Sequence, residues 1–294
     1  MQRRTFVATS TAASLASVLA RPIRALGAAT EKNGIGLQLW TVRNQLTNDV
    51  SGTLKAVVDA GYKQVELMNI AESADIVRTA KDLGLEVRSA FFNWETIAVP
   101  SNSNAPAIEK LIDSAKEYGL EYMVFGYIGK QARDTSDKLK GIADRTNAAA
   151  EKVHAAGMKL SYHNHAFEFE KLDNGKTGFE IFMEGFDPQL VNFELDVFWA
   201  AIGGWAPIDT MKKLGKRLGQ IHLKDLKAGQ GTIYDEGKVP NDAFQEVGNG
   251  ILDMKSIVQL ATDYGVTQFH VEQDQSPDPI ASIGQSSRYV KTIW

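Results

Sequence analysis

The stretch KLSYHNH, residues 159–165, ends a short apolar run on side chains that can bind a metal. Three other stretches repeat this arrangement: VNFELDV at 191–197, GQIHLKD at 219–225 and QFHVEQD at 268–274. Each apolar run indicates a buried strand, and a buried strand normally stops before it meets a charge. The four side chains concerned, His163, Asp196, His222 and Glu272, could therefore converge into one nitrogen and oxygen site for a divalent metal.

Strand-like and helix-like segments alternate from Gly34 onward with little else between them. The apolar runs predict eight strands, at 35–42, 64–68, 87–92, 122–125, 159–162, 192–197, 220–223 and 268–271. Segments of helical period lie between them, and several end in a glycine just before the next strand, as at Gly61, Gly119 and Gly265. This order predicts an α/β fold with a single domain, a closed barrel of eight parallel strands over residues 34–294.

An open, doubly wound sheet is the alternative to the barrel. A nucleotide-binding fold of that kind carries a glycine-rich phosphate loop after its first strand. The chain has no such loop there. The sequence therefore favours the barrel.

Polar residues at the carboxyl ends of parallel barrel strands have functional weight, because the active site of such a barrel forms there. Alternation along a strand places Glu194 and Asp196 on one face if Leu195 packs outward. By the same two-residue period, His270 shares the inward face with Glu272. His163 and His165 also share a face, and only one of these two histidines needs to be a ligand.

Composition excludes several classes of function. The formal net charge is -4, and no basic stripe with interleaved aromatic residues is present, so nucleic acid and anionic membranes are not expected as partners. The chain has no cysteine, which excludes disulfides, thiolate zinc sites and cysteine nucleophiles.

The first 28 residues resemble a cleavable twin-arginine signal peptide. Arg3 and Arg4 precede a mildly apolar stretch from Phe6 to Ala20, and small residues follow. That stretch is shorter than the roughly 20 residues that span a bilayer, so no stable membrane anchor is expected. We therefore expect export to the periplasm or the extracellular space; the alternative is a frayed amphipathic helix.

Taken together, the motifs of the chain resemble those of the xylose isomerase-like TIM barrel superfamily of sugar isomerases, epimerases and related lyases. This superfamily has the (β/α)8 fold. The resemblance spans residues 34–294 and rests on GLQLWTVR, GYKQVEL, YHNHAFEF, ELD, IHLKD, VGNGILD and VEQD. It implies one divalent metal, commonly manganese, magnesium, cobalt or zinc. The implied ligands here are His163, Asp196, His222 and Glu272.

One position departs from the epimerase branch of that superfamily. The branch has a glutamate on the fifth strand that works with the glutamate of the last strand, whereas this chain has His163. A histidine cannot serve as ligand and free base at once, so the catalytic base must be sought elsewhere. His165 is the first candidate and Glu272 the second, with Glu168 as a substitute if its loop folds back.

Five further residues are candidates for substrate binding, each with a structural alternative. Trp40 and Trp94 could form apolar walls against a sugar, or they could pack within loops. Glu66, Lys224 and Asp225 could contact hydroxyl groups, and a solvated salt bridge is the alternative for the last two.

These features predict a metal-dependent isomerase or epimerase that acts on an unphosphorylated keto sugar by removing a proton next to the carbonyl. A 3-keto-glycoside lyase, which would release the aglycone by β-elimination, is the alternative within enzymes. A non-catalytic sugar-binding protein is the alternative from another class. A DNA-repair endonuclease on the same barrel is disfavoured by the acidic charge and the expected export. The aromatic residues of the barrel loops could serve a homo-oligomer as readily as a substrate.

Overall fold

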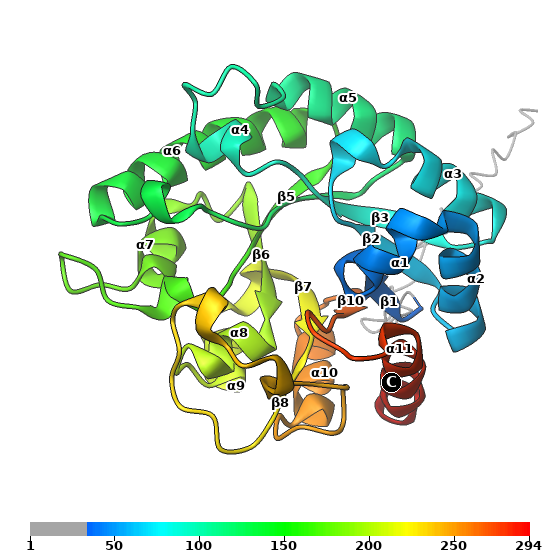
Figure 1. The fold of residues 1–294 in the computed structure, drawn as a ribbon. Helices are drawn as coiled ribbons and strands as arrows, with labels where there is room; N and C mark the ends of the chain where they lie inside the picture. Colours follow the sequence, from blue (N-terminus) through cyan, green and yellow to red (C-terminus); the bar gives the residue numbers. More distant parts are fainter. Residues whose placement is uncertain (1–33) are drawn as a thin grey trace, which may run out of the picture. The chain divides into compact units, whose positions relative to one another are not determined.

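Eight parallel strands close into a barrel, with helices packed around its outside (Figure 1). The computed structural model describes residues 34–294. The barrel strands, in chain order, are β1 (Gly36–Gln38), β2 (Gln64–Leu67), β3 (Glu86–Phe91), β4 (Tyr122–Phe125), β5 (Lys159–His163), β6 (Val191–Asp196), β7 (Leu218–Leu223) and β10 (Gln268–Val271). The predicted α/β barrel is therefore confirmed. The predicted signal segment, residues 1–28, lies outside the described residues, and export stays a prediction.

Helices connect successive strands and cover the barrel. They are α1 (Arg43–Asn48), α2 (Val50–Ala60), α3 (Ala74–Asp82), α4 (Glu95–Ala98), α5 (Ile108–Tyr118), α6 (Ser136–Ala155), α7 (Gly178–Gly185), α8 (Val197–Ile202), α9 (Pro207–Leu214), α10 (Met254–Asp263) and α11 (Pro279–Ile293). Helices α2 and α5 end at Gly61 and Gly119, as predicted, and both glycines adopt the left-handed conformation. Within residues 34–294, no helix is long and apolar enough to cross a membrane.

The first and last barrel strands close the sheet. Gly36 of β1 pairs with His270 of β10 and with Gln64 of β2. A Cβ atom at Gly36 would overlap the His270 ring and the side chain of Gln64. The glycine at this position therefore lets three strands approach closely around a large imidazole inside the barrel.

Two features differ from the sequence prediction. The first strand ends at Gln38, and Leu39–Val42 form a 3-10 helix instead of continuing the strand. The Gln38 side chain accepts a hydrogen bond from the backbone N–H of Trp40 and so starts this turn. In addition, a small antiparallel pair, β8 (Asp225–Leu226) with β9 (Phe244–Gln245), brackets a long excursion after β7.

Candidate functional site

Four side chains at the carboxyl ends of the strands form a buried group that we call the mouth cluster: His163, Asp196, His222 and Glu272. One ligand atom from each lies within 4.8 Å of the corresponding atoms of the others. These are the four residues predicted as ligands, and they come from β5, β6, β7 and the residue after β10. The structure thus brings them together, while their role as metal ligands stays a prediction.

The donor atoms of the mouth cluster suit a divalent metal. His222 Nδ1 lies 3.0 Å from Glu272 Oε2 and 3.9 Å from Asp196 Oδ2. His163 Nδ1 lies 3.1 Å from Glu194 Oε2, which leaves Nε2 as its nitrogen for a metal. Two imidazoles and two carboxylates fit first-row transition metals such as manganese, cobalt or zinc.

Lys224 is fully buried beside this cluster. Its ammonium lies 3.0 Å from Asp196 Oδ2, 2.7 Å from Glu272 Oε2 and 2.7 Å from Asp274 Oδ2. Burial alone would lower the pKa of Lys224, but the three carboxylates outweigh burial and raise it, so this side chain stays charged. Burial opposes ionisation of Glu272 too, yet Lys224 and His222 lower its pKa. Glu272 is thus held ionised, as metal binding requires, whereas burial raises the pKa of Asp196 despite the nearby Lys224.

A second group, the inner cluster, lies deeper in the barrel and consists of Glu66, Glu194, His222 and His270. All four are buried, with ligand atoms again within 4.8 Å of one another. His222 belongs to both clusters, because its Nε2 lies 2.6 Å from Glu66 Oε2 while its Nδ1 faces Glu272. A carboxylate on the second nitrogen fixes the orientation of a metal-binding histidine.

Hydrogen bonds hold Glu66 in place. It accepts one from Gln38 Nε2 at 2.7 Å and one from Ser89 Oγ at 2.5 Å. Burial would raise the pKa of Glu66, but His270 and His222 lower it to about 2. Burial and then Glu66 raise the pKa of the neighbouring Glu194. The inner cluster therefore contains an ionised Glu66 that receives three donors and positions His222.

His165 and Glu168 lie on the loop after β5. The His165 ring lines the cavity at the mouth, and its Nδ1 is buried without a hydrogen-bond partner. Burial and then Lys224 lower the pKa of His165 to about 3, so the imidazole is neutral at physiological pH. Glu168 accepts hydrogen bonds from Tyr162 Oη at 2.5 Å and from the backbone N–H of His165 at 2.9 Å. Glu168 thus holds the His165 loop and is bonded away from the mouth cluster.

A cavity of about 520 Å³ opens above the mouth cluster. His163, His165 and Glu272 line it, together with Gln38 and Asp274. Of the described residues that line this cavity, none is a lysine or an arginine. Two of the predicted ligands, His163 and Glu272, and the predicted base His165 therefore face one space of the size that takes small molecules.

The predicted substrate-binding residues fall into three groups. Trp40 lines the cavity. Lys224 lies buried among carboxylates, and Glu66 lies in the inner cluster. Both contact the mouth cluster directly, and their binding of a substrate stays a prediction.

Trp94 and Asp225 lie outside the cavity lining. Trp94 packs edge-on against Tyr127 and lines two neighbouring depressions. Both Asp225 oxygens accept backbone hydrogen bonds, from Gly248, Gly250 and Leu252 among others. Asp225 therefore anchors the 248–252 turn. It does not form the solvated salt bridge that was the alternative to substrate binding.

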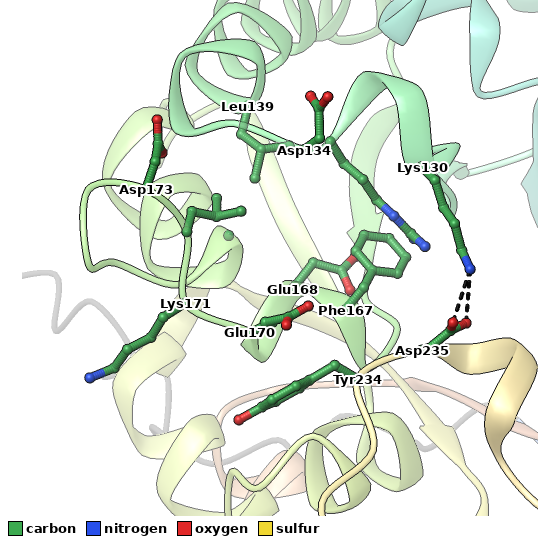
Figure 2. Close-up of a pocket in the computed structure, with 13 residues that line it drawn as sticks. Lys130, Asp134, Leu139, Phe167, Glu168, Glu170, Lys171, Asp173, Tyr234 and Asp235 are labelled. Carbon is green, nitrogen blue, oxygen red and sulfur yellow. Dashed lines mark hydrogen bonds and ion pairs between the residues drawn. The ribbon is translucent and has the colours of Figure 1, made fainter.

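The excursion after β7 contributes a segment that the sequence analysis missed, residues 233–241, which we call the strap. Glu236 of the strap accepts hydrogen bonds from Tyr127 Oη at 2.9 Å and from Arg133 Nη2 at 2.8 Å. Asp235 pairs with Lys130 at 3.0 Å, as Figure 2 shows. Glu236 lines the mouth cavity, whereas Asp235 lines a second cavity of about 440 Å³ beside Phe167 and Glu168. The strap therefore lies between the two cavities.

The fold and site define a class: a closed parallel α/β barrel whose carboxyl-end mouth holds a buried group of histidines and carboxylates. A family profile described as "Xylose isomerase-like TIM barrel" matches residues 54–293. The chain belongs to this family.

Known proteins similar to this chain include sugar-modifying enzymes. An inosose dehydratase of Bacillus cereus (strain AH820) is 23% identical over 282 residues, covering 84% of this chain and 91% of the relative. Among solved structures, a sugar phosphate isomerase/epimerase from Parabacteroides distasonis has a TM-score of 0.71 at 22% identity, covering 91% and 96% of the two chains. A 3-keto-D-glucoside 4-epimerase from E. coli has a TM-score of 0.63 at 15% identity, covering 89% and 100%. At these identities the structural matches show the fold alone.

Proposed function

We propose that this protein is a divalent-metal-dependent enzyme that removes a proton next to the carbonyl of an unphosphorylated keto sugar. The observation that carries the proposal is the convergence of His163, Asp196, His222 and Glu272 beneath a cavity that His165 also lines. A bound divalent metal would polarise the carbonyl and a neighbouring hydroxyl and so stabilise an enolate.

The residues of the chain supply the proton transfer. His165 is neutral and its buried Nδ1 has no partner, so it can accept the proton from the carbon. The electron pair of the broken C–H bond becomes the C=C bond of the enolate. Glu272, already held by Lys224 and His222, is the second candidate for the base. Glu168 keeps the His165 backbone in place during this step.

Return of the proton decides the outcome of the reaction. A proton returned to the neighbouring carbon gives an isomerase, and one returned to the opposite face of the same carbon gives an epimerase. If a substituent β to the carbonyl leaves with its bonding electrons instead, the enzyme is a lyase. Elimination from a 3-keto-glycoside is the second candidate, because the relatives include dehydratases and a 3-keto-glucoside epimerase.

An unphosphorylated substrate is supported by the charges around the cavity. Phosphate groups are bound mainly by arginine, lysine and helix N-termini. The described residues that line the cavity include neither arginine nor lysine, and the nearby Lys224 is already paired with three carboxylates. A neutral sugar therefore fits the lining better than a sugar phosphate.

Metal content and solvent deuterium exchange test this proposal together. We expect about one divalent metal per chain and incorporation of deuterium from solvent into a keto sugar or a 3-keto-glycoside. Release of an aglycone would select the lyase, and exchange without release would select the isomerase or epimerase. A protein that binds sugar but holds no metal and exchanges no deuterium would refute the proposal in favour of a non-catalytic sugar-binding protein.

A further inference from the structure

The mouth cavity has two chemically different ends. Its inner end carries Gln38, His163 and Glu272. We call the apolar and largely aromatic part of its lining the outer end: Trp40, Met68, Tyr127, Trp199, Val239 and Phe244. The polar residues Glu236, Asn241, Asp274 and Gln275 also line the cavity. The polar end suits the hydroxyl groups of one sugar ring, whereas the outer end offers flat apolar surfaces. The whole cavity, about 520 Å³, is within the range of pockets that hold drug-sized ligands.

Trp40 is an exposed aromatic wall that the structure holds in place. The residue is 44% exposed, and of residues 34–294 only Trp40 and Ile251 are large hydrophobic residues that are exposed. The Arg43 guanidinium lies 4.4 Å from the Trp40 ring centroid. Arg43 also donates hydrogen bonds to the carbonyls of Trp40 at 2.7 Å and Asp274 at 3.0 Å. An indole fixed in this way keeps an apolar face toward the cavity at little further cost in side-chain entropy.

Trp199 contributes a hydrogen-bond donor without a partner. Its side chain is almost completely buried, it lines the same cavity, and its Nε1 makes no hydrogen bond. The indole packs beside His165 at 5.3 Å and edge-on to Phe244 at 5.7 Å between ring centroids. A buried N–H without an acceptor is destabilising, and a ligand oxygen would remove that penalty.

We propose that the outer end is a subsite for a flat apolar aglycone, so that the ligand of this cavity is an aryl glycoside. The sugar lies at the polar end, the aryl group lies against Trp40 and Phe244, and the linking oxygen accepts the Trp199 N–H. Glu236 is already bonded to Tyr127 and Arg133, and Asp274 is paired with Lys224. These two carboxylates of the lining are therefore not free to bind a charged group. Only the assignment of the sugar end rests on the proposed function.

Calorimetry with stable glucosides tests the subsite without turnover. The metal-loaded protein is titrated with phenyl glucoside and methyl glucoside, each as both anomers. We expect one phenyl glucoside to bind about tenfold more tightly than its methyl counterpart, because aromatic contacts and apolar burial together give that order of free energy. Trp40→Ala should abolish the difference and Trp40→Phe should keep part of it. Ile251→Ala, which changes the other exposed hydrophobic residue, is the matched control and should keep all of it.

A separate binding experiment tests whether the Trp199 N–H bonds the linking oxygen. Trp199→Phe keeps an aromatic ring and removes the N–H, so it should weaken phenyl glucoside about fivefold or more. The same variant should bind a carbon-linked phenyl glucoside, which lacks the linking oxygen, as the parent protein does. Equal weakening of both ligands would overturn the assignment of the N–H to the linking oxygen.

Two results would overturn the subsite itself. One is equal affinity for phenyl and methyl glucosides, and the other is tighter binding of a disaccharide, which would mark the outer end as a second sugar site. Deuterium exchange separates this failure from failure of the proposed function. Exchange without an aryl preference would reject the subsite alone, whereas an aryl preference dependent on Trp40, with no metal and no exchange, would reject the proposed function alone.

Discussion

The mouth cluster and the inner cluster contain the same kinds of side chain and share His222, but they differ in access. His163 and Glu272 of the mouth cluster line the cavity, whereas Glu66 and Glu194 of the inner cluster are fully buried within the barrel. Glu66 is already saturated by Gln38, Ser89 and His222. Residue type alone therefore does not distinguish a candidate metal site from the network that supports it; contact with a cavity does.

The largest effects on turnover are expected at His163 and His165, and metal content should distinguish the two residues. His163→Ala should lose bound metal and reduce turnover by about 10³-fold or more, since metal stabilisation of an enolate contributes several kcal/mol. His165→Ala should keep its metal and lose about 10²- to 10⁴-fold in turnover, as expected for a general base. Metal analysis and deuterium-exchange rates measure the two effects.

His154→Ala is the control for this pair, because His154 is exposed on α6. It should change neither metal content nor rate. If His163→Ala and His165→Ala both retain metal and activity, the assignment of the mouth cluster is wrong.

The next effect concerns the inner cluster. Glu66→Gln removes the negative partner of His222 Nε2 and should weaken metal binding by about 10- to 100-fold, the usual effect of losing a carboxylate behind a metal-binding histidine. Competition with a chelator measures the affinity. Glu72→Gln, at an exposed position, is the matched control. Metal affinity in Glu66→Gln equal to that of the control would remove the inner cluster from the site.

The next prediction concerns Glu168, an ionisable residue that belongs to neither cluster, and its effect on stability. Burial raises the pKa of Glu168 from 4.5 to about 8, so the folded protein keeps it protonated where the unfolded chain ionises. Its contribution to stability is complete below pH 4.5 and is lost as the pH rises to about 8. Glu168→Gln imitates the protonated acid and should remove this part of the pH dependence, on the order of 5 kcal/mol.

Denaturant unfolding of both proteins between pH 4.5 and pH 8.5 measures this difference. The free energy of unfolding of the parent protein should fall relative to that of the variant as the pH rises. Parallel curves would show that Glu168 is ionised in the folded protein.

The smallest effect is expected at His270. Neither of its ring nitrogens makes a hydrogen bond, in contrast to those of His222, and its Nδ1 approaches the carboxylates of Glu66 and Glu194 only to 3.7 Å. His270→Asn should therefore change metal affinity by less than roughly threefold, below the worth of one ordinary hydrogen bond. A larger change, in the same chelator competition, would show that the inner cluster acts as one unit and not through Glu66 alone.

The sequence predicted the barrel and the mouth cluster because both follow from local patterns. Strand ends such as FELD and QIHL place a polar residue after an apolar run, and the closed topology then brings these ends together. Glu194 and Asp196 lie on the predicted inward face, and both approach His222. Here the two-residue period of a strand was sufficient information.

Other parts of the site depend on contacts between distant segments. Gln38 ends β1 early because its side chain binds the Trp40 backbone, which no periodicity reveals. Asp225 looked like a substrate contact, but it anchors the turn at Gly248 and Gly250. The strap has neither helical nor strand period and is held by Arg133, which lies far away in sequence. The one sequence feature that could have indicated the strap is the run of two acidic residues, Asp235 and Glu236, followed by Gly237.

The sharing of His222 by the two clusters has a thermodynamic consequence. One ring connects both clusters, through Nδ1 to Glu272 and through Nε2 to Glu66. Coupling between two binding equilibria is reciprocal. If protonation of the inner cluster weakens metal binding by some factor, metal binding must lower the proton affinity of the inner cluster by the same factor. Loading the metal would then release protons from deep inside the barrel, and the enclosed inner cluster would act as an acid whose strength the metal sets.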